Sequence, residues 1–334
     1  MGDKEPADSG TAHAQGASSD SPPAETSRRA SLPARATYLA YRAGGVIGQA
    51  LPASLGRPLA TGVGRALMLA MPGRRAMATR HLSRASGGRL RGAELKAAVA
   101  GTFDSYARYW LEMFRLPHED AAAIEANIDV VGYEHVEAGL AAGRGVILAL
   151  PHLGGWEFAG AWVVKAKGNR LLVVVEPVEP PQLFEWFVRV RAAMGMDVVA
   201  LGPKAASASL RALRDNWLLA LVCDRDLRGD GVEVEFFGEK TTMPAGPAML
   251  ALRGGAVIVP VAVYFRPQGG HHAVVRPPLD TTRRGSVRDD VARITQDLAH
   301  EFEGLISAEP QQWHLLQPNW PSDHLSGDER SEHQ

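Results

Sequence analysis

The chain has 334 residues, of which 46% are hydrophobic, and a formal net charge of −1 at pH 7. This length and composition allow one large or two ordinary domains with a substantial core, and they exclude a fibrous protein. The near-zero charge argues against a general nucleic-acid binder, because no basic field covers the whole chain. Cys223 is the only cysteine, so no intramolecular disulfide can form, which is typical of a reducing compartment.

The first 33 residues are rich in Ser, Ala, Pro, Gly and acidic side chains. They lack an apolar core, so they predict a disordered tail and not a secretory signal. We expect a single domain over residues 34–320, made of a basic helical segment (34–116) and an α/β core (117–320). The polar composition of residues 321–334 predicts a frayed C-terminal tail.

Two segments rich in Ala, Gly and Leu, Tyr38–Ala50 and Arg57–Met71, suit short amphipathic helices with arginines on one side. Between Arg35 and Lys96 the basic residues far outnumber the one acid, Glu94. This charge favours contact with an anionic membrane surface, although the same helices could simply pack on the main domain, and the two interpretations are compatible. No run of roughly 18 uncharged apolar residues occurs, so a transmembrane span is not expected.

The segment Glu94–Arg115 is the clearest helix of the first half, because its apolar side chains recur at spacings of three and four. These side chains are Leu95, Val99, Phe103, Tyr106, Trp110 and Met113. So dense a stripe is more often a core face than a ligand groove.

The second half alternates short apolar runs with helical patterns. Strands are expected at Ile128–Val131, Val146–Leu150, Leu171–Val175, Val198–Leu201, Leu218–Val222, Val232–Phe236, Val257–Phe265 and Ala273–Arg276. Helices are expected at Tyr133–Ala142, Trp156–Ala166, Pro181–Met194, Ala205–Asn216 and Ala245–Arg253, with a last amphipathic helix from Val287 to Leu305. This alternation predicts an α/β fold with a central mixed, mostly parallel sheet flanked by helices, to which N-terminal amphipathic helices are added. Antiparallel neighbours are expected within residues 232–276.

A tight turn after one buried strand presents a histidine. Val146–Leu150 carries no polar side chain, and Pro151 ends the strand because proline cannot donate to the sheet. His152 therefore lies at the carboxyl end of a strand, where open α/β sheets bind ligands. Glu157, in the first turn of the next helix, could orient the imidazole for general-base catalysis. A histidine and a glutamate at this spacing form structural pairs more often than catalytic ones. The buried strand that precedes His152 favours the catalytic interpretation.

Several motifs along the chain carry a resemblance to a known family. They are Ser105–Glu112 (SYARYWLE), Leu150–Glu157 (LPHLGGWE), Cys223–Leu227 (CDRDL), Gly231–Glu239 (GVEVEFFGE), Met243–Ala251 (MPAGPAMLA) and Trp313–Trp320 (WHLLQPNW). Together they resemble the lipid A biosynthesis branch of the glycerolipid acyltransferase superfamily, and within it the enzymes that acylate phosphatidylinositol mannosides. The resemblance extends in order from about Tyr38 to Trp320.

The resemblance implies an enzyme that moves a fatty acyl group, typically palmitoyl, from acyl-CoA to a mannose 6-hydroxyl. It implies a peripheral protein at the cytoplasmic face of the cell membrane, with acyl-CoA as co-substrate and no metal or further cofactor. His152 would take the proton from the sugar hydroxyl. Asp224 matches the family's charge-relay acid, one methylene shorter than the usual glutamate, whereas Glu157 matches the acid of the histidine motif. Either carboxylate could orient His152; without the resemblance, Asp224 would be interpreted as part of a solvated loop.

Substrate contacts also follow from the resemblance. Glu176, after another apolar strand, would accept hydrogen bonds from mannose hydroxyls. Arg191 matches an arginine near the acyl donor and would engage CoA phosphates or hold Glu176, although it could equally be a surface charge. Arg225 would pair with Glu157 or Asp226.

Two further residues, Arg253 and Cys223, carry expectations of their own. Arg253 stands where the family has an acidic residue near the ligand, so contacts there are expected to differ. Cys223 ends an apolar strand beside acids and is interpreted as buried structure and not as a nucleophile.

The alternative functions are an acyltransferase for another glycolipid or a lysophospholipid, a lipid thioesterase, and a lipid-binding module without activity. The lack of a Gly-x-Ser-x-Gly elbow argues against an α/β-hydrolase.

Overall fold

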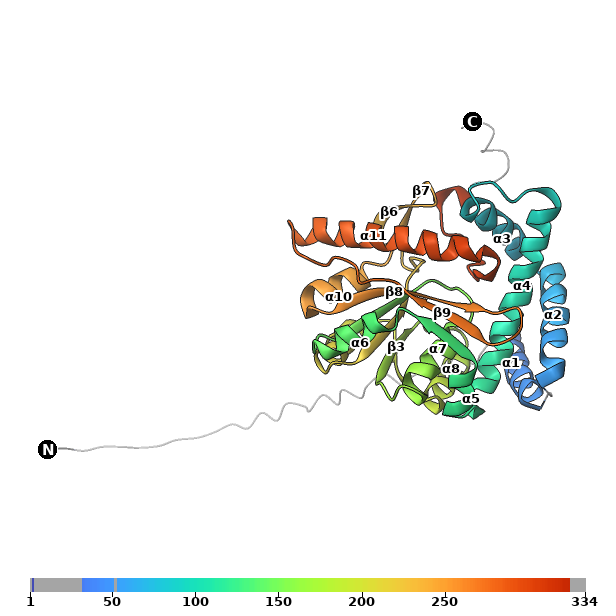
Figure 1. Ribbon diagram of the computed structural model, residues 1–334, viewed down its shortest axis with the longest axis horizontal. Coiled ribbons are helices and arrows are strands. Elements are labelled where there is room, and N and C mark those ends of the chain that lie inside the picture. The colour runs from blue at the N-terminus through green and yellow to red at the C-terminus, as the bar shows by residue number, and fades with distance from the viewer. Residues whose placement is uncertain (1, 3–31, 51–52, 325–334) are drawn as a thin grey trace.

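The computed structural model describes residue 2 and residues 32–50 and 53–324. Figure 1 shows a central sheet with helices on both faces and a layer of N-terminal helices on one side. The tail expected over residues 1–33 falls outside the described residues, apart from residue 2 and the first two residues of α1, which begins at Leu32.

Apart from β7, which was not predicted, the described strands agree closely with the apolar runs. They are β1 (Ile128–Val131), β2 (Val146–Leu150), β3 (Leu171–Val175), β4 (Asp197–Ala200), β5 (Leu218–Val222), β6 (Val232–Phe236), β7 (Glu239–Met243), β8 (Val257–Phe265) and β9 (His271–Val275). Within the described residues the main sheet has seven strands in the order β1-β9-β8-β2-β5-β3-β4. Its β8–β9 pair is antiparallel and its other pairs are parallel, so the predicted mixed, mostly parallel sheet is confirmed. Strands β6 and β7 form a separate antiparallel hairpin.

The helices with predicted ranges begin and end within a few residues of them, apart from α1 and α2, which begin earlier; α3 and α5 match no predicted range. They are α1 (Leu32–Ala50), α2 (Ala53–Ala70), α3 (Pro72–Ala85), α4 (Gly92–Arg115), α5 (Ala121–Ala126), α6 (Glu134–Ala141), α7 (Trp156–Lys165), α8 (Pro181–Ala193), α9 (Ala205–Arg214), α10 (Gly246–Gly254) and α11 (Val287–Ala308). Short 3-10 helices follow α4, follow α11 and lie at Pro321–Asp323.

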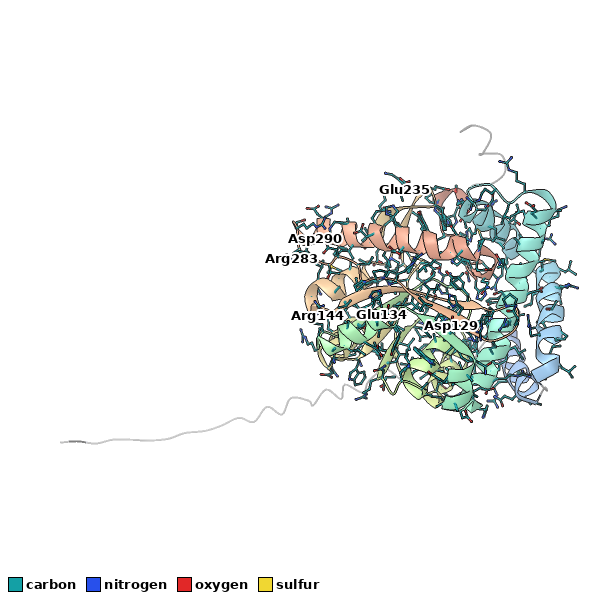
Figure 2. All side chains as sticks on the ribbon, viewed as in Figure 1. Asp129, Glu134, Arg144, Glu235, Arg283 and Asp290 are labelled. Carbon is teal, nitrogen blue, oxygen red and sulfur yellow. The ribbon has the colours of Figure 1, made fainter. Side chains whose placement is uncertain are left out.

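Strand β2 is buried on both faces because alternate side chains enter two different cores. Ile147 and Ala149 pack with side chains of α9, α10 and α11, whereas Leu148 and Leu150 pack with side chains of α6 and α7. Figure 2 shows side chains filling the space between the sheet and the helices. The charged residues Glu134, Arg144 and Glu235 stand exposed on the surface. The sheet is therefore the middle layer of three.

Helices α1 and α2 lie on α4, outside the sheet layers (Figure 1). Their small residues permit this close packing: a Cβ added at Gly64 would lie 2.7 Å from the carbonyl oxygen of Phe103. The packing interpretation of these helices is thus confirmed, and it leaves their outer faces open. Over the described part of the chain, no helix has both the length and the hydropathy needed to cross a bilayer.

The C-terminal segment continues into structure where its composition predicts fraying. Asp323 is buried in the last 3-10 helix, Pro321–Asp323. Its carboxylate lies 3.1 Å from Nε2 of His81 and 3.0 Å from Nη1 of Arg84, both on α3. Because these side chains attach the segment to α3, the structured chain extends at least to residue 323.

The turn after β2 requires glycine at position 154. Gly154 has φ +60°, and an added Cβ would lie 1.9 Å from the carbonyl oxygen of Val263. We expect Gly154→Ala to lower the free energy of unfolding by more than about 2 kcal/mol, since it combines a left-handed backbone with a steric clash. Gly202→Ala, at a position with open space around its Cβ, is the matched control. Urea unfolding of both variants measures the difference, and equal midpoints would contradict this account of the turn.

Candidate active site

Three polar side chains meet at one edge of the sheet. Asp224 lies just beyond β5, Glu176 follows β3, and His152 lies two residues beyond β2. These strands are neighbours and parallel, so their carboxyl ends lie side by side. The predicted convergence of the three residues is confirmed.

His152 and Asp224 form a hydrogen-bonded pair. Nδ1 of His152 lies 2.6 Å from Oδ1 of Asp224, and the His152 backbone N–H donates to Oδ2 at 3.0 Å. The indole N–H of Trp313 donates to the same Oδ2 at 2.8 Å. Asp224 is fully buried, whereas the His152 side chain is 34% exposed. Burial by itself raises the pKa of Asp224, but attraction to His152 and the donated hydrogen bonds outweigh it and lower that pKa.

This geometry decides between the two candidate carboxylates. Glu157 is buried and forms an ion pair with Arg191, and it accepts a hydrogen bond from the hydroxyl of Tyr109 at 3.3 Å. Asp224, and not Glu157, is therefore the carboxylate bonded to His152, and the expected orienting role of Glu157 is corrected. The physical reason is that a buried carboxylate in the first turn of α7 takes the nearest cation, which α8 supplies.

Arg191 is held inside the protein and not on its surface. It is 8% exposed, lies on α8 and lines the same cavity as Glu157. Burial by itself lowers the pKa of Arg191, but the charge of Glu157 reverses this, so the guanidinium stays protonated. The expectation that Arg191 holds Glu176 is wrong, because its partner is Glu157.

The mouth of the site is bridged by a second ion pair. Nη2 of Arg225 lies 3.2 Å from Oε2 of Glu176, whose side chain is 48% exposed. The expected pairing of Arg225 with Glu157 or Asp226 is wrong. Asp226 instead accepts backbone N–H groups of its own loop, as its short distance to Gly231 N (2.7 Å) shows. Glu176 is thus paired with a cation from the loop after a neighbouring strand, whereas Asp226 is held by N–H groups of its own loop.

Arg253 is exposed, whereas Cys223 is buried. Arg253 lies exposed in the last turn of α10 and is not among the residues that line the cavity, so its expected place near the ligand is corrected. Cys223 is buried, and burial raises the pKa of its thiol. A neutral buried thiol agrees with the interpretation of Cys223 as structure.

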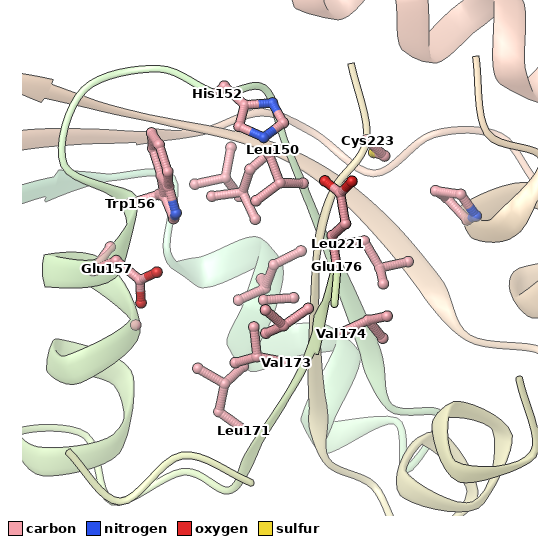
Figure 3. A pocket seen from close by; sticks show the side chains of 18 of the residues that line it. Leu150, His152, Trp156, Glu157, Leu171, Val173, Val174, Glu176, Leu221 and Cys223 are labelled. Atoms are coloured by element: carbon pink, nitrogen blue, oxygen red, sulfur yellow. The ribbon is translucent and has the colours of Figure 1, made fainter. Parts of the chain in front are cut away.

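A mostly apolar cavity of about 640 Å³ extends from this site. It lies against the sheet face that packs on α6 and α7, and alternate side chains of several strands line it. Figure 3 shows His152 at one end, Glu157 and Trp156 to one side, and Val173 and Leu171 farther along. The cavity can take an extended apolar chain with its reactive end beside the imidazole.

Aromatic residues of α4 also contribute to the cavity wall. Val99, Phe103 and Met113 of the apolar stripe are buried core, as predicted, but Trp110 lines the cavity together with Tyr109. The stripe therefore serves both the core and the cavity. Helical spacing identifies the apolar face of a helix but not which of its residues border a hollow.

A histidine bonded to a buried carboxylate at the mouth of a mostly apolar cavity suits an enzyme that uses general-base chemistry on an apolar substrate. The model of the family described as "Bacterial lipid A biosynthesis acyltransferase" matches residues 24–322 of the chain. The protein belongs to this family and is an acyltransferase.

Curated relatives agree with this assignment. The phosphatidylinositol mannoside acyltransferase of Mycolicibacterium smegmatis is 42% identical over 236 residues, which cover 70% of this chain and 75% of the relative. An enzyme of the same name from Mycobacterium tuberculosis is 42% identical over 231 residues, 67% of this chain and 71% of the relative. The lipid A biosynthesis acyltransferase of Haemophilus influenzae is 24% identical over 197 residues, 57% of this chain and 58% of the relative.

The Glu157–Arg191 pair predicts a stability effect. Arg191→Met leaves the Glu157 carboxylate buried without a counter-charge, so we expect the free energy of unfolding to fall by about 3–5 kcal/mol. Replacing both residues by Met removes the uncompensated charge and should recover most of the loss. Arg189→Met, on the exposed side of α8, is the control. Guanidinium unfolding measures all three, and a single Arg191→Met variant as stable as Arg189→Met would contradict a structural role for the pair.

Proposed function

We propose that this protein is an acyl-CoA-dependent O-acyltransferase that moves a palmitoyl-type group to a mannose 6-hydroxyl of a phosphatidylinositol mannoside. The observation that carries the proposal is the His152–Asp224 pair at the mouth of the apolar cavity. Two relatives of the protein at 42% identity, both named phosphatidylinositol mannoside acyltransferase, support the choice of acceptor.

His152 acts as the general base. Because Asp224 engages Nδ1, the ring proton resides there and Nε2 is left to accept the proton of the sugar hydroxyl. The sugar oxygen then bonds to the thioester carbonyl carbon, and Asp224 stabilises the imidazolium. As the carbon–sulfur bond breaks, His152 returns the proton to the departing CoA sulfur. The step balances with acyl-CoA as co-substrate and with no other cofactor.

The acyl chain occupies the apolar cavity. Each methylene that leaves water contributes about 0.8 kcal/mol, so a long chain is strongly held there with its thioester beside His152. At the mouth, Glu176 is half-exposed and can accept hydrogen bonds from the sugar, while Arg225 fixes its position. The glycolipid headgroup and the thioester thus meet at the polar end of the cavity.

Helices α1 and α2 form the membrane-facing surface in this proposal. They expose large apolar side chains, among them Val46 (64% exposed), Leu69 (70%) and Val63 (44%). Arg42, Arg57 and Arg65 are also exposed on these two helices. Apolar side chains with interspersed arginines suit the interface of an anionic bilayer, so the protein would rest on the inner leaflet as a peripheral protein.

The activity is tested with labelled palmitoyl-CoA and a purified phosphatidylinositol dimannoside. Labelled acylated glycolipid is expected from the native protein. His152→Ala should lower kcat by roughly 10²- to 10⁴-fold while the protein stays folded, because the imidazole is partly exposed. His272→Ala, a partly exposed histidine on β9, is the control.

Other products would point to other functions. Free labelled palmitate without glycolipid would indicate a thioesterase, and binding without turnover would indicate a lipid-binding module. Transfer to a lysophospholipid in preference to the mannoside would replace the proposed acceptor.

Vesicle binding tests the membrane surface. We expect Val46→Gln combined with Val63→Gln to weaken partition onto phosphatidylglycerol-containing vesicles by roughly tenfold or more, because two side chains lose burial in the interface. Val287→Gln, at a position as exposed as Val63 (43% against 44%) but on α11, should leave partition unchanged. Sedimentation with sucrose-loaded vesicles measures both, and equal partition of all variants would mean that α1 and α2 only pack on α4.

A further inference from the structure

The segment from Gln312 to Asp323 contains a motif that the chemistry above leaves unused. We propose that Trp313 is a positioning residue for acyl transfer: its indole N–H fixes the Asp224 carboxylate in the orientation that holds His152. The proposal rests on the proposed function, because it assumes that the His152–Asp224 pair supplies the base.

The hydrogen bonds of Asp224 hold its carboxylate in a single orientation. Oδ1 takes the imidazole at 2.6 Å, while Oδ2 takes the His152 backbone N–H at 3.0 Å and the indole N–H at 2.8 Å. Asp224 is fully buried and Trp313 is 3% exposed, so water has no ready access to replace a missing indole. Asn319 adds a contact to the main chain, from its side-chain amide to the carbonyl oxygen of Asp224 at 3.3 Å. Removal of the indole N–H would therefore leave Oδ2 with one donor and the carboxylate freer to rotate.

Trp313 is also tied to the backbone that carries His152. The N–H of His314 donates to the carbonyl oxygen of His152 at 2.7 Å, and the N–H of Gly154 donates to that of Gln312 at 2.9 Å. These bonds set residues 312–314 antiparallel to the catalytic turn, next to a bridge between Leu153 and Trp313. The indole therefore reaches Asp224 from a segment that is paired with the histidine's own turn.

The far end of the segment is anchored independently of the site. The indole N–H of Trp320 donates to the carbonyl oxygen of Phe236 at 3.1 Å. The Asp323 carboxylate accepts from His81 and Arg84 of α3. The near end is held by its own pairing with the turn, so the position of the Trp313 indole before substrate binds does not depend on these far contacts.

Few titratable groups besides His152 face Asp224. Burial lowers the pKa of His314 to about 3, so its ring is neutral, and its Nε2 lies 2.8 Å from Oγ of Ser105. Burial raises the pKa of the adjacent Cys223 thiol, which is also neutral. Arg225 follows Asp224 in the chain, but its guanidinium is paired with Glu176. The ionised state of Asp224 thus depends on His152 and on the donated hydrogen bonds, including that of Trp313.

The test compares two buried tryptophans of one segment. Trp313→Phe removes the donor to Asp224 and is expected to lower kcat by about 10- to 100-fold with KM changed less than about twofold. The acid limb of the kcat profile should also move to higher pH, because an Asp224 carboxylate with one donor fewer attracts the imidazole proton more strongly. Trp320→Phe removes an indole donor to a backbone carbonyl and should lower the unfolding temperature while leaving kcat and its pH profile unchanged.

A second substitution separates the hydrogen bond from packing. Incorporating 3-benzothienylalanine at position 313 keeps the bicyclic shape but has sulfur in place of the N–H, so it should fold and reproduce the loss in kcat even if Trp313→Phe does not fold. Native kcat and pH profile in this protein would overturn the proposal, as would equal losses of kcat in Trp313→Phe and Trp320→Phe. The native protein is assayed in parallel: if it transfers no acyl group the proposed function fails, whereas transfer with an insensitive position 313 contradicts only the role of Trp313.

Discussion

The site depends on one constraint, which is that the Asp224 carboxylate is ionised while fully buried. A buried carboxylate is tolerable only when it is hydrogen-bonded or paired, and here the imidazole, the His152 backbone and the Trp313 indole meet that need. Two of these donors belong to His152 in the turn after β2, the third belongs to the C-terminal segment, and Asp224 itself follows β5. The sheet edge, the glycine turn and the C-terminal segment must therefore be assembled together before the pair exists.

Much of the fold could be predicted because the central strands, above all β2 and β8, are buried on both faces and so appear as unbroken apolar runs. Hairpin strand β7 (EKTTM) escaped prediction because its side chains are mostly polar and it pairs only with β6. The positions of His152 and Asp224 at strand ends followed from the same runs. Periodicity and motif comparison alone were thus enough to predict the fold class and the strand-end positions of His152 and Asp224.

The resemblance offered Asp224 as one of two partners of His152, but the other pairings within the site could not be predicted, because they depend on distances between elements far apart in the chain. Glu157 has the spacing expected of a carboxylate that orients His152, yet Arg191 on another helix takes it. Arg225 likewise pairs with Glu176 on a neighbouring strand end. Trp313 lies in a motif that the resemblance already singled out, but no spacing in the sequence connects it to Asp224. Burial and charge compensation decide such pairs, and both appear only in three dimensions.

The pairing of residues 312–314 with the turn at His152 also affects the order in which the protein matures. The Trp313 indole that donates to Asp224 lies 89 residues after it in the chain. Contacts across such separations form late, because the entropy of closing the loop must be met first. A nascent chain that has completed only the strands of the sheet would carry the cavity without this donor, so the support of the His152–Asp224 pair would be complete only after residues 312–314 are synthesised.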